Sequence, residues 1–127
     1  MKKEIILLLF SLILSPVFAQ KKAAHPELAL NVHIATYDVR LNWIPDPRWP
    51  DARYEIERSE DGRTYLLLDC IAASQVGKAG SCIYTDANAR FLIGPLIYYR
   101  IRRVDADGVS VAGPVAVARI DPHVTGD

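Results

Sequence analysis

The residue best placed to do chemistry in this sequence is Trp49, which lies between Pro47 and Pro50 in a proline-rich segment. Prolines this dense exclude a helix or a central strand, so the segment is predicted to be a loop. An indole on a stiff loop can stack on a sugar ring or anchor a protein partner. The alternative, which the sequence favours, is that the ring folds back and caps the open end of the domain. The candidate binding residues are Trp49, Arg48 and Tyr37.

No pattern in the sequence indicates catalysis or a bound cofactor. It contains no serine nucleophile elbow, no glycine-rich phosphate loop and no His-Glu-x-x-His helix, so we expect a protein that is not an enzyme. The segment Asp105-Ala-Asp107-Gly108 is interpreted as a hairpin turn, because a calcium site needs six to eight oxygen ligands. The histidines are far apart in the chain, and no metal site is expected. They are His25, His33 and His123.

The two cysteines, Cys70 and Cys82, are predicted to form a disulfide. An even pair in an exported protein is first interpreted in this way, and closing so short a loop would contribute roughly 3 kcal/mol. The spacing fits neither a Cys-x-x-Cys redox motif nor a zinc site. The alternative is a free or regulatory thiol.

The first residues are typical of a signal peptide. Lys2 and Lys3 precede an apolar run over residues 5–14, and small residues end at Ala19, where cleavage is expected. The apolar run is short for a membrane span, which needs roughly 20 residues. We therefore expect a secreted or periplasmic protein with no membrane insertion after cleavage.

The balance of charge argues against nucleic-acid binding. Fifteen basic and fifteen acidic residues give a formal net charge of zero, and such a protein has no general attraction for polyanions. Arg100, Arg102 and Arg103 form the one basic cluster. We interpret it as the solvent face of a strand with its flanking turn and not as a phosphate site.

Apolar residues alternate with polar ones along most of the chain, which is typical of strands with one buried face. The sequence is organised around a hairpin of residues 97–111, whose second arm is broken at Gly113-Pro114 because proline cannot donate to a sheet. The expected architecture is a seven-stranded antiparallel sandwich of two sheets. Its strands are residues 28–35, 39–43, 54–58, 64–71, 82–86, 97–104 and 109–120. Its expected core includes Trp43, Tyr54, Ile56, Tyr99 and Ile101.

Around this domain, residues 1–19 are the expected signal peptide and residues 20–27 a flexible leader. The domain itself covers residues 28–120, and residues 121–127 form a polar tail.

Several of these segments resemble a fibronectin type III domain, an immunoglobulin-like fold. Residues 39–43 with their tryptophan resemble that family's second strand, and residues 54–59 resemble its third. Residues 98–108 are similar to the sixth strand and hairpin of bacterial extracellular members, with either Tyr98 or Tyr99 as the packed tyrosine. The resemblance covers residues 28–120. It implies a non-catalytic exported binding or structural module with a protein or polysaccharide partner of the cell envelope or exterior. A stand-alone accessory carbohydrate-binding domain is the alternative.

Overall fold

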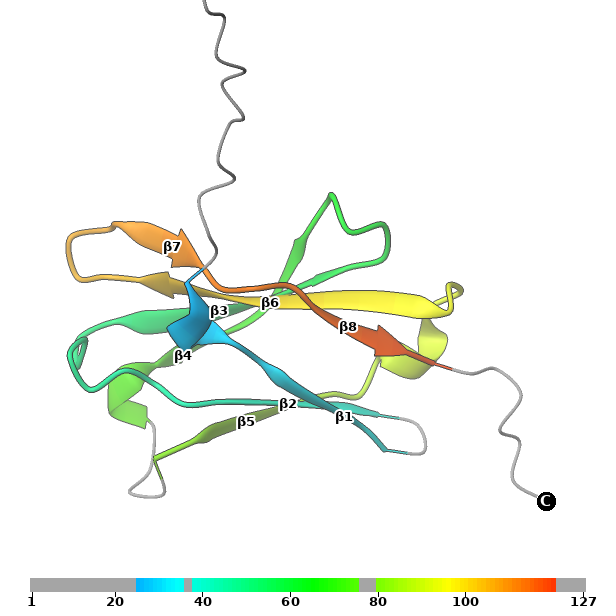
Figure 1. The fold of residues 1–127 in the computed structure, drawn as a ribbon, viewed down its shortest axis with the longest axis horizontal. Helices are drawn as coiled ribbons and strands as arrows, with labels where there is room; N and C mark the ends of the chain where they lie inside the picture. Colours follow the sequence, from blue (N-terminus) through cyan, green and yellow to red (C-terminus); the bar gives the residue numbers. More distant parts are fainter. Residues whose placement is uncertain (1–24, 36–37, 76–79, 121–127) are drawn as a thin grey trace, which may run out of the picture.

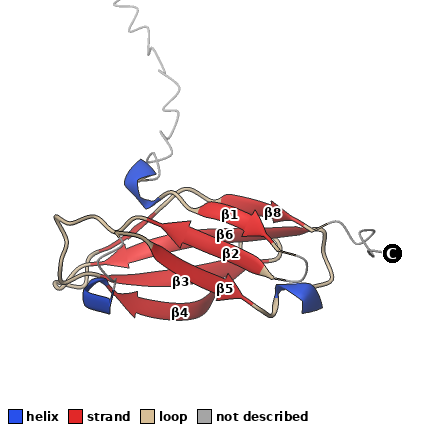
Figure 2. Ribbon diagram, turned by 90° about the horizontal axis from the view of Figure 1, so that it is seen from below, coloured by secondary structure: helices blue, strands red, loops and turns tan. Residues whose placement is uncertain are grey.

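In a computed structural model, which describes residues 25–35, 38–75 and 80–120, the chain forms two antiparallel sheets that face each other (Figures 1 and 2). No α-helix occurs in the described part, only three short 3-10 turns: η1 (Pro26–Leu28), η2 (Ala73–Gln75) and η3 (Ala89–Phe91). The strands are β1 (Asn31–Ile34), β2 (Val39–Trp43), β3 (Arg53–Ser59), β4 (Leu66–Ala72), β5 (Cys82–Asp86), β6 (Leu96–Val104), β7 (Ser110–Ala112) and β8 (Ala116–Arg119).

The smaller sheet has the order β1-β2-β5, and the larger has the order β4-β3-β6-β7 with β8 also paired to β6. Successive side chains of a strand point to opposite faces of the sheet, so the alternation of apolar and polar residues explains which side chains face inward. In β2, Val39, Leu41 and Trp43 are buried while the two residues between them are exposed. The two inner rows meet between the sheets and form one apolar core.

The five expected core residues all lie in this interior, and none is more than 1% exposed. They are Trp43, Tyr54, Ile56, Tyr99 and Ile101. Trp43 packs against Tyr54 with ring centroids 6.3 Å apart and planes tilted by 50°. Tilted pairs of this kind are a favoured aromatic geometry. The adjacent tyrosines of β6 face opposite ways, so Tyr99 is the packed one, whereas Tyr98 is half-buried on the outer face.

The described residues form eight strands where the sequence predicts seven, because the last predicted strand is divided into two. It breaks at Gly113-Pro114, as expected, and the pieces β7 and β8 both pair with β6. At the break, the Gly113 amide still donates to the Ile101 carbonyl at 2.8 Å. A Cβ atom at Gly113 would overlap the backbone oxygen of Leu28. Glycine therefore lets the N-terminal segment cross close to the break.

The disulfide predicted between Cys70 and Cys82 is not formed, and both thiols are free. Cys70 lies in β4 of the larger sheet with an exposed side chain. Cys82 lies in β5 of the smaller sheet, opposite Trp43, and is buried. The two cysteines thus belong to different sheets and are not bonded to each other.

The described part begins inside the segment expected to be a leader. Pro26–Leu28 forms the turn η1, and its last residue is fully buried in the core. The expected signal peptide, Tyr37 and the C-terminal tail lie outside the described residues. Among the residues that are described, no helix is long and apolar enough to cross a membrane.

Candidate functional site

The loop that carries Trp49 is fastened to the core of the sandwich. The Asp46 amide donates to the hydroxyl oxygen of the buried Tyr54 at 3.1 Å. Two backbone bonds then close the turn, from the Trp49 amide to the Asp46 carbonyl at 3.0 Å and from the Ala52 amide to the Trp49 carbonyl at 3.3 Å. The loop therefore presents its side chains from a fixed backbone.

Arg48 is bound to Asp46 within the same turn. Its Nε lies 3.0 Å and 2.9 Å from the two carboxylate oxygens, and its backbone amide donates to Oδ1 at 2.9 Å. The side-chain hydrogen bonds from Arg48, with the backbone bond and the nearby charge, lower the pKa of Asp46 to about 2. Arg48, a candidate binding residue from the sequence, thus forms an ion pair with Asp46 while its side chain stays 74% exposed.

This contact leads to a prediction about pH. In Arg48→Ala the pKa of Asp46 should rise from about 2 towards its usual 3.8, because the largest stabilisation of the carboxylate is removed. Folding lowers the pKa of Asp46, so the ionised carboxylate stabilises the folded state at pH values above its unfolded pKa. This stabilisation is lost as the pH falls towards 2. An NMR titration of the side-chain carboxyl carbons measures this directly.

Asp61 is the control within the same titration. Its pKa is also lowered to about 2, but chiefly by backbone hydrogen bonds from Thr64 and Arg63 and by a side-chain bond from Ser59. It should therefore be unchanged in Arg48→Ala. An Asp46 pKa that stays near 2 in the variant would contradict the assignment.

Trp49 lies against Arg103 and remains accessible. The guanidinium carbon of Arg103 lies 4.5 Å from the centre of the indole ring, so one ring face covers a cation. The tryptophan is nevertheless 38% exposed. The ring therefore contacts a buried cation and offers part of its surface to solvent.

Arg103 does not lie on the solvent face, so the interpretation of the arginine cluster was wrong for this residue. Its side chain is 5% exposed, with Nε 3.2 Å from Asp105 and Nη1 3.8 Å from Glu27. Nη1 has no hydrogen-bond partner among the described residues. Arg100 and Arg102 do lie on the outer face, where both contact Glu57.

A pocket of about 180 Å³ opens beside Trp49, between its loop and the turn that joins β6 to β7. Three aspartates contribute to its wall, and only one basic residue does. The lining residues are Arg48, Trp49, Pro50, Asp51, Ala52, Asp105, Ala106 and Asp107. The segment Asp105–Asp107, expected to be only a turn, thus forms one side of the candidate site. Among the described residues no cluster suited to a metal ion is found.

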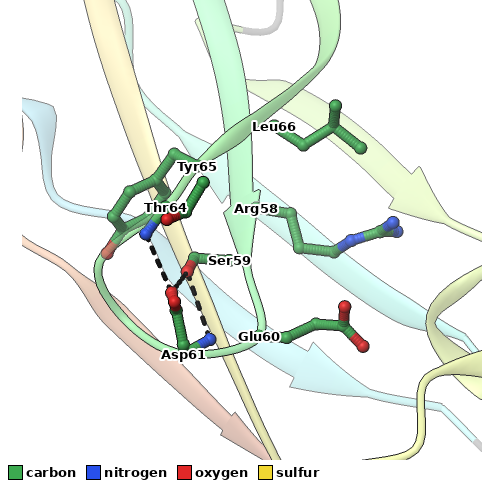
Figure 3. A pocket seen from close by; sticks show the side chains of 7 residues that line it. All are labelled: Arg58, Ser59, Glu60, Asp61, Thr64, Tyr65 and Leu66. Carbon is green, nitrogen blue, oxygen red and sulfur yellow. Dashed lines mark hydrogen bonds between the residues drawn. The ribbon is translucent and has the colours of Figure 1, made fainter.

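A second, larger pocket of about 440 Å³ lies at the hairpin between β3 and β4 and was not predicted from the sequence (Figure 3). Several of its polar groups form hydrogen bonds within the protein, whereas the Tyr65 hydroxyl has no hydrogen-bond partner among the described residues. Asp61 accepts hydrogen bonds from the Arg63 and Thr64 amides at 2.8 Å and from the Ser59 hydroxyl. Arg58 turns towards Asp86. These bonds hold the turn in shape. The Trp49 pocket is the better candidate for binding because an exposed indole lines it.

The fold is an antiparallel β-sandwich, in which a three-stranded sheet faces a larger one. No protein-family model and no curated protein sequence matches the chain.

Among solved structures, the chain is similar to an Fn3-like protein from Clostridium thermocellum, with a TM-score of 0.52, 20% identity, and coverage of 73% of this chain and 92% of that one. It is also similar to the pectate lyase Pel3 from Pectobacterium carotovorum, with a TM-score of 0.56 and 16% identity. That match covers 75% of this chain but only 27% of the lyase chain. At these identities the likenesses show a shared fold: a β-sandwich like that of the Fn3-like protein.

Proposed function

We propose that this protein is a non-catalytic, exported module of the fibronectin type III kind that binds a polysaccharide through Trp49. The observation that carries the proposal is the indole itself, which lies against Arg103 yet is 38% exposed beside a pocket. Aromatic rings stack on the apolar faces of sugars, and carboxylates accept hydrogen bonds from sugar hydroxyls. The site offers both groups on a rigid backbone.

The solved structures support the proposal in a limited way. One of them is a pectate lyase, a protein named for a polysaccharide substrate, and this chain corresponds to about a quarter of it. A non-catalytic domain attached to such an enzyme is one setting in which a sugar-binding sandwich is useful. Export is proposed from the signal-like residues 1–19. A protein partner at the same loop is the competing hypothesis.

The test is the substitution Trp49→Ala in binding to soluble plant and bacterial polysaccharides, measured by affinity electrophoresis and calorimetry. Loss of a central aromatic anchor costs about 2 kcal/mol or more, so affinity should fall at least tenfold. If no polysaccharide is bound by the wild type, while an envelope protein is captured through Trp49, the protein-partner hypothesis replaces this one.

Phe91→Ala is the matched control. Phe91 is also exposed, at 69%, and also lies against an arginine, with Arg90 4.8 Å from its ring centre. It belongs to η3, which follows β5, and η3 lies at the end of the sandwich away from the loop between β2 and β3 (Figure 1). Affinity should be unchanged in this variant. An equal loss in both variants would show that binding does not depend on the Trp49 site.

A further inference from the structure

The positive charges around the Trp49 pocket are already neutralised from within. Arg48 is bound to Asp46 in the same turn. Arg103 lies beneath the indole, next to Asp105 and within 3.8 Å of Glu27. An arginine recognises a ligand carboxylate by presenting a free pair of N–H groups to it. Arg103 is only 5% exposed and cannot present such a pair. Arg48 is 74% exposed, but its charge is already balanced by Asp46.

The negative charges at the pocket are less compensated. Asp51 and Asp107 are exposed and line its wall from two different loops. Neither forms an ion pair among the described residues, in contrast to Asp46 and Asp105. Their oxygens are therefore free to accept hydrogen bonds from a ligand. They also give the rim of the pocket a negative potential.

These charges discriminate between classes of sugar polymer. A neutral sugar can stack on Trp49 and donate its hydroxyl protons to Asp51 and Asp107. A uronic acid brings a carboxylate to the same rim, where like charges repel and the two nearby arginine charges are already balanced by Asp46 and Asp105. We propose that the Trp49 pocket selects uncharged sugar residues and rejects polyuronates. This inference rests on the proposed function and specifies its ligand class.

The inference separates this chain from what the name of its structural neighbour suggests. Pectate is a polyanion, and the neighbour is a pectate lyase. The shared fold does not distinguish between neutral and acidic polymers, whereas the charges of the side chains at the pocket do.

The experiment compares neutral and acidic polymers under identical conditions. Binding of β-1,4-galactan, hydroxyethyl cellulose and polygalacturonate is measured at low ionic strength, with EDTA present so that no divalent cation bridges carboxylates. Wild type should bind a neutral polymer at least tenfold more tightly than polygalacturonate. The double substitution Asp51→Asn, Asp107→Asn keeps the shape of both side chains, and it should raise the affinity for polygalacturonate by tenfold or more. Added salt should abolish most of that gain.

A control variant with the same change in net charge is Glu60→Gln, Asp69→Asn, whose residues are exposed and lie outside this pocket. It should leave the selectivity unchanged. Preferential binding of polygalacturonate by wild type would overturn the inference while leaving the proposed polysaccharide function intact. Binding of none of the three polymers, or of a wider polysaccharide panel, would overturn both.

Discussion

Replacing Asp86 by alanine is expected to destabilise the protein by about 3–5 kcal/mol, the range for breaking a buried ion pair from one side. Asp86 is 2% exposed, and its two carboxylate oxygens accept hydrogen bonds from Nη1 of Arg58 at 3.0 Å and 2.9 Å. It also accepts from the Tyr99 hydroxyl at 2.8 Å. Without the carboxylate, a guanidinium that is only 12% exposed keeps its charge with no partner.

Urea denaturation followed by tryptophan fluorescence measures this loss, and Asp107→Ala is the control at an exposed aspartate. Tyr99→Phe should cost less, about 1–2 kcal/mol, because it removes one neutral donor and leaves the ion pair intact. Burial raises the pKa of Tyr99, so its hydroxyl remains a donor at neutral and mildly alkaline pH. A loss below 1 kcal/mol in Asp86→Ala would show that the network contributes little.

Trp43→Ala is the second change with a large expected effect, again about 3–5 kcal/mol, because it empties the centre of the core. Trp43 is 1% exposed and packs on Tyr54 between the two sheets. Its Nε1 is buried with no hydrogen-bond partner in the described structure. Trp43→Phe should therefore be much milder, since it removes an unsatisfied donor along with part of the ring.

Thermal unfolding shows which of the two indoles contributes more to stability. The variants to compare are Trp43→Ala, Trp43→Phe and Trp49→Ala. Trp49→Ala should lower the melting temperature less than Trp43→Ala does, because the Trp49 ring is 38% exposed. If Trp49→Ala were as destabilising as Trp43→Ala, Trp49 would be part of the core and its role in binding would need another variant, such as Trp49→Phe.

The fold was predictable where one face of a strand is buried and the other is exposed to solvent. The ranges predicted for β2 and β5 coincide with the observed Val39–Trp43 and Cys82–Asp86. Prediction was weaker at the edges of the sheets. Residues 28–35 were expected to be one strand, yet Pro26–Leu28 is a turn and β1 has only four residues. In β4, Leu66 and Leu67 are exposed although the run is apolar, because an edge strand is not fully covered.

The candidate site was only half predictable. The proline-rich loop and Trp49 were visible as local features, but the partners of Trp49 come from distant segments. Arg103 has a signal in the sequence that was missed: it follows Ile101 in the inward row of β6 and is therefore a buried cation that needs a partner. Glu27, which approaches it, is far away in sequence. The disulfide was predicted from composition, and composition does not tell which sheet each cysteine joins.

The position of β6 has a consequence for the order in which the protein folds. This strand pairs with β3, β7 and β8, and its contact between Arg100 and Glu57 joins residues 43 positions apart. Local hairpins such as β1-β2 and β3-β4 can form early, but their apolar faces stay uncovered until β6 arrives. Such non-local pairing makes folding slow, on the order of milliseconds to seconds. Changes within β6 should therefore slow folding, whereas changes in the Trp49 loop should mainly speed unfolding.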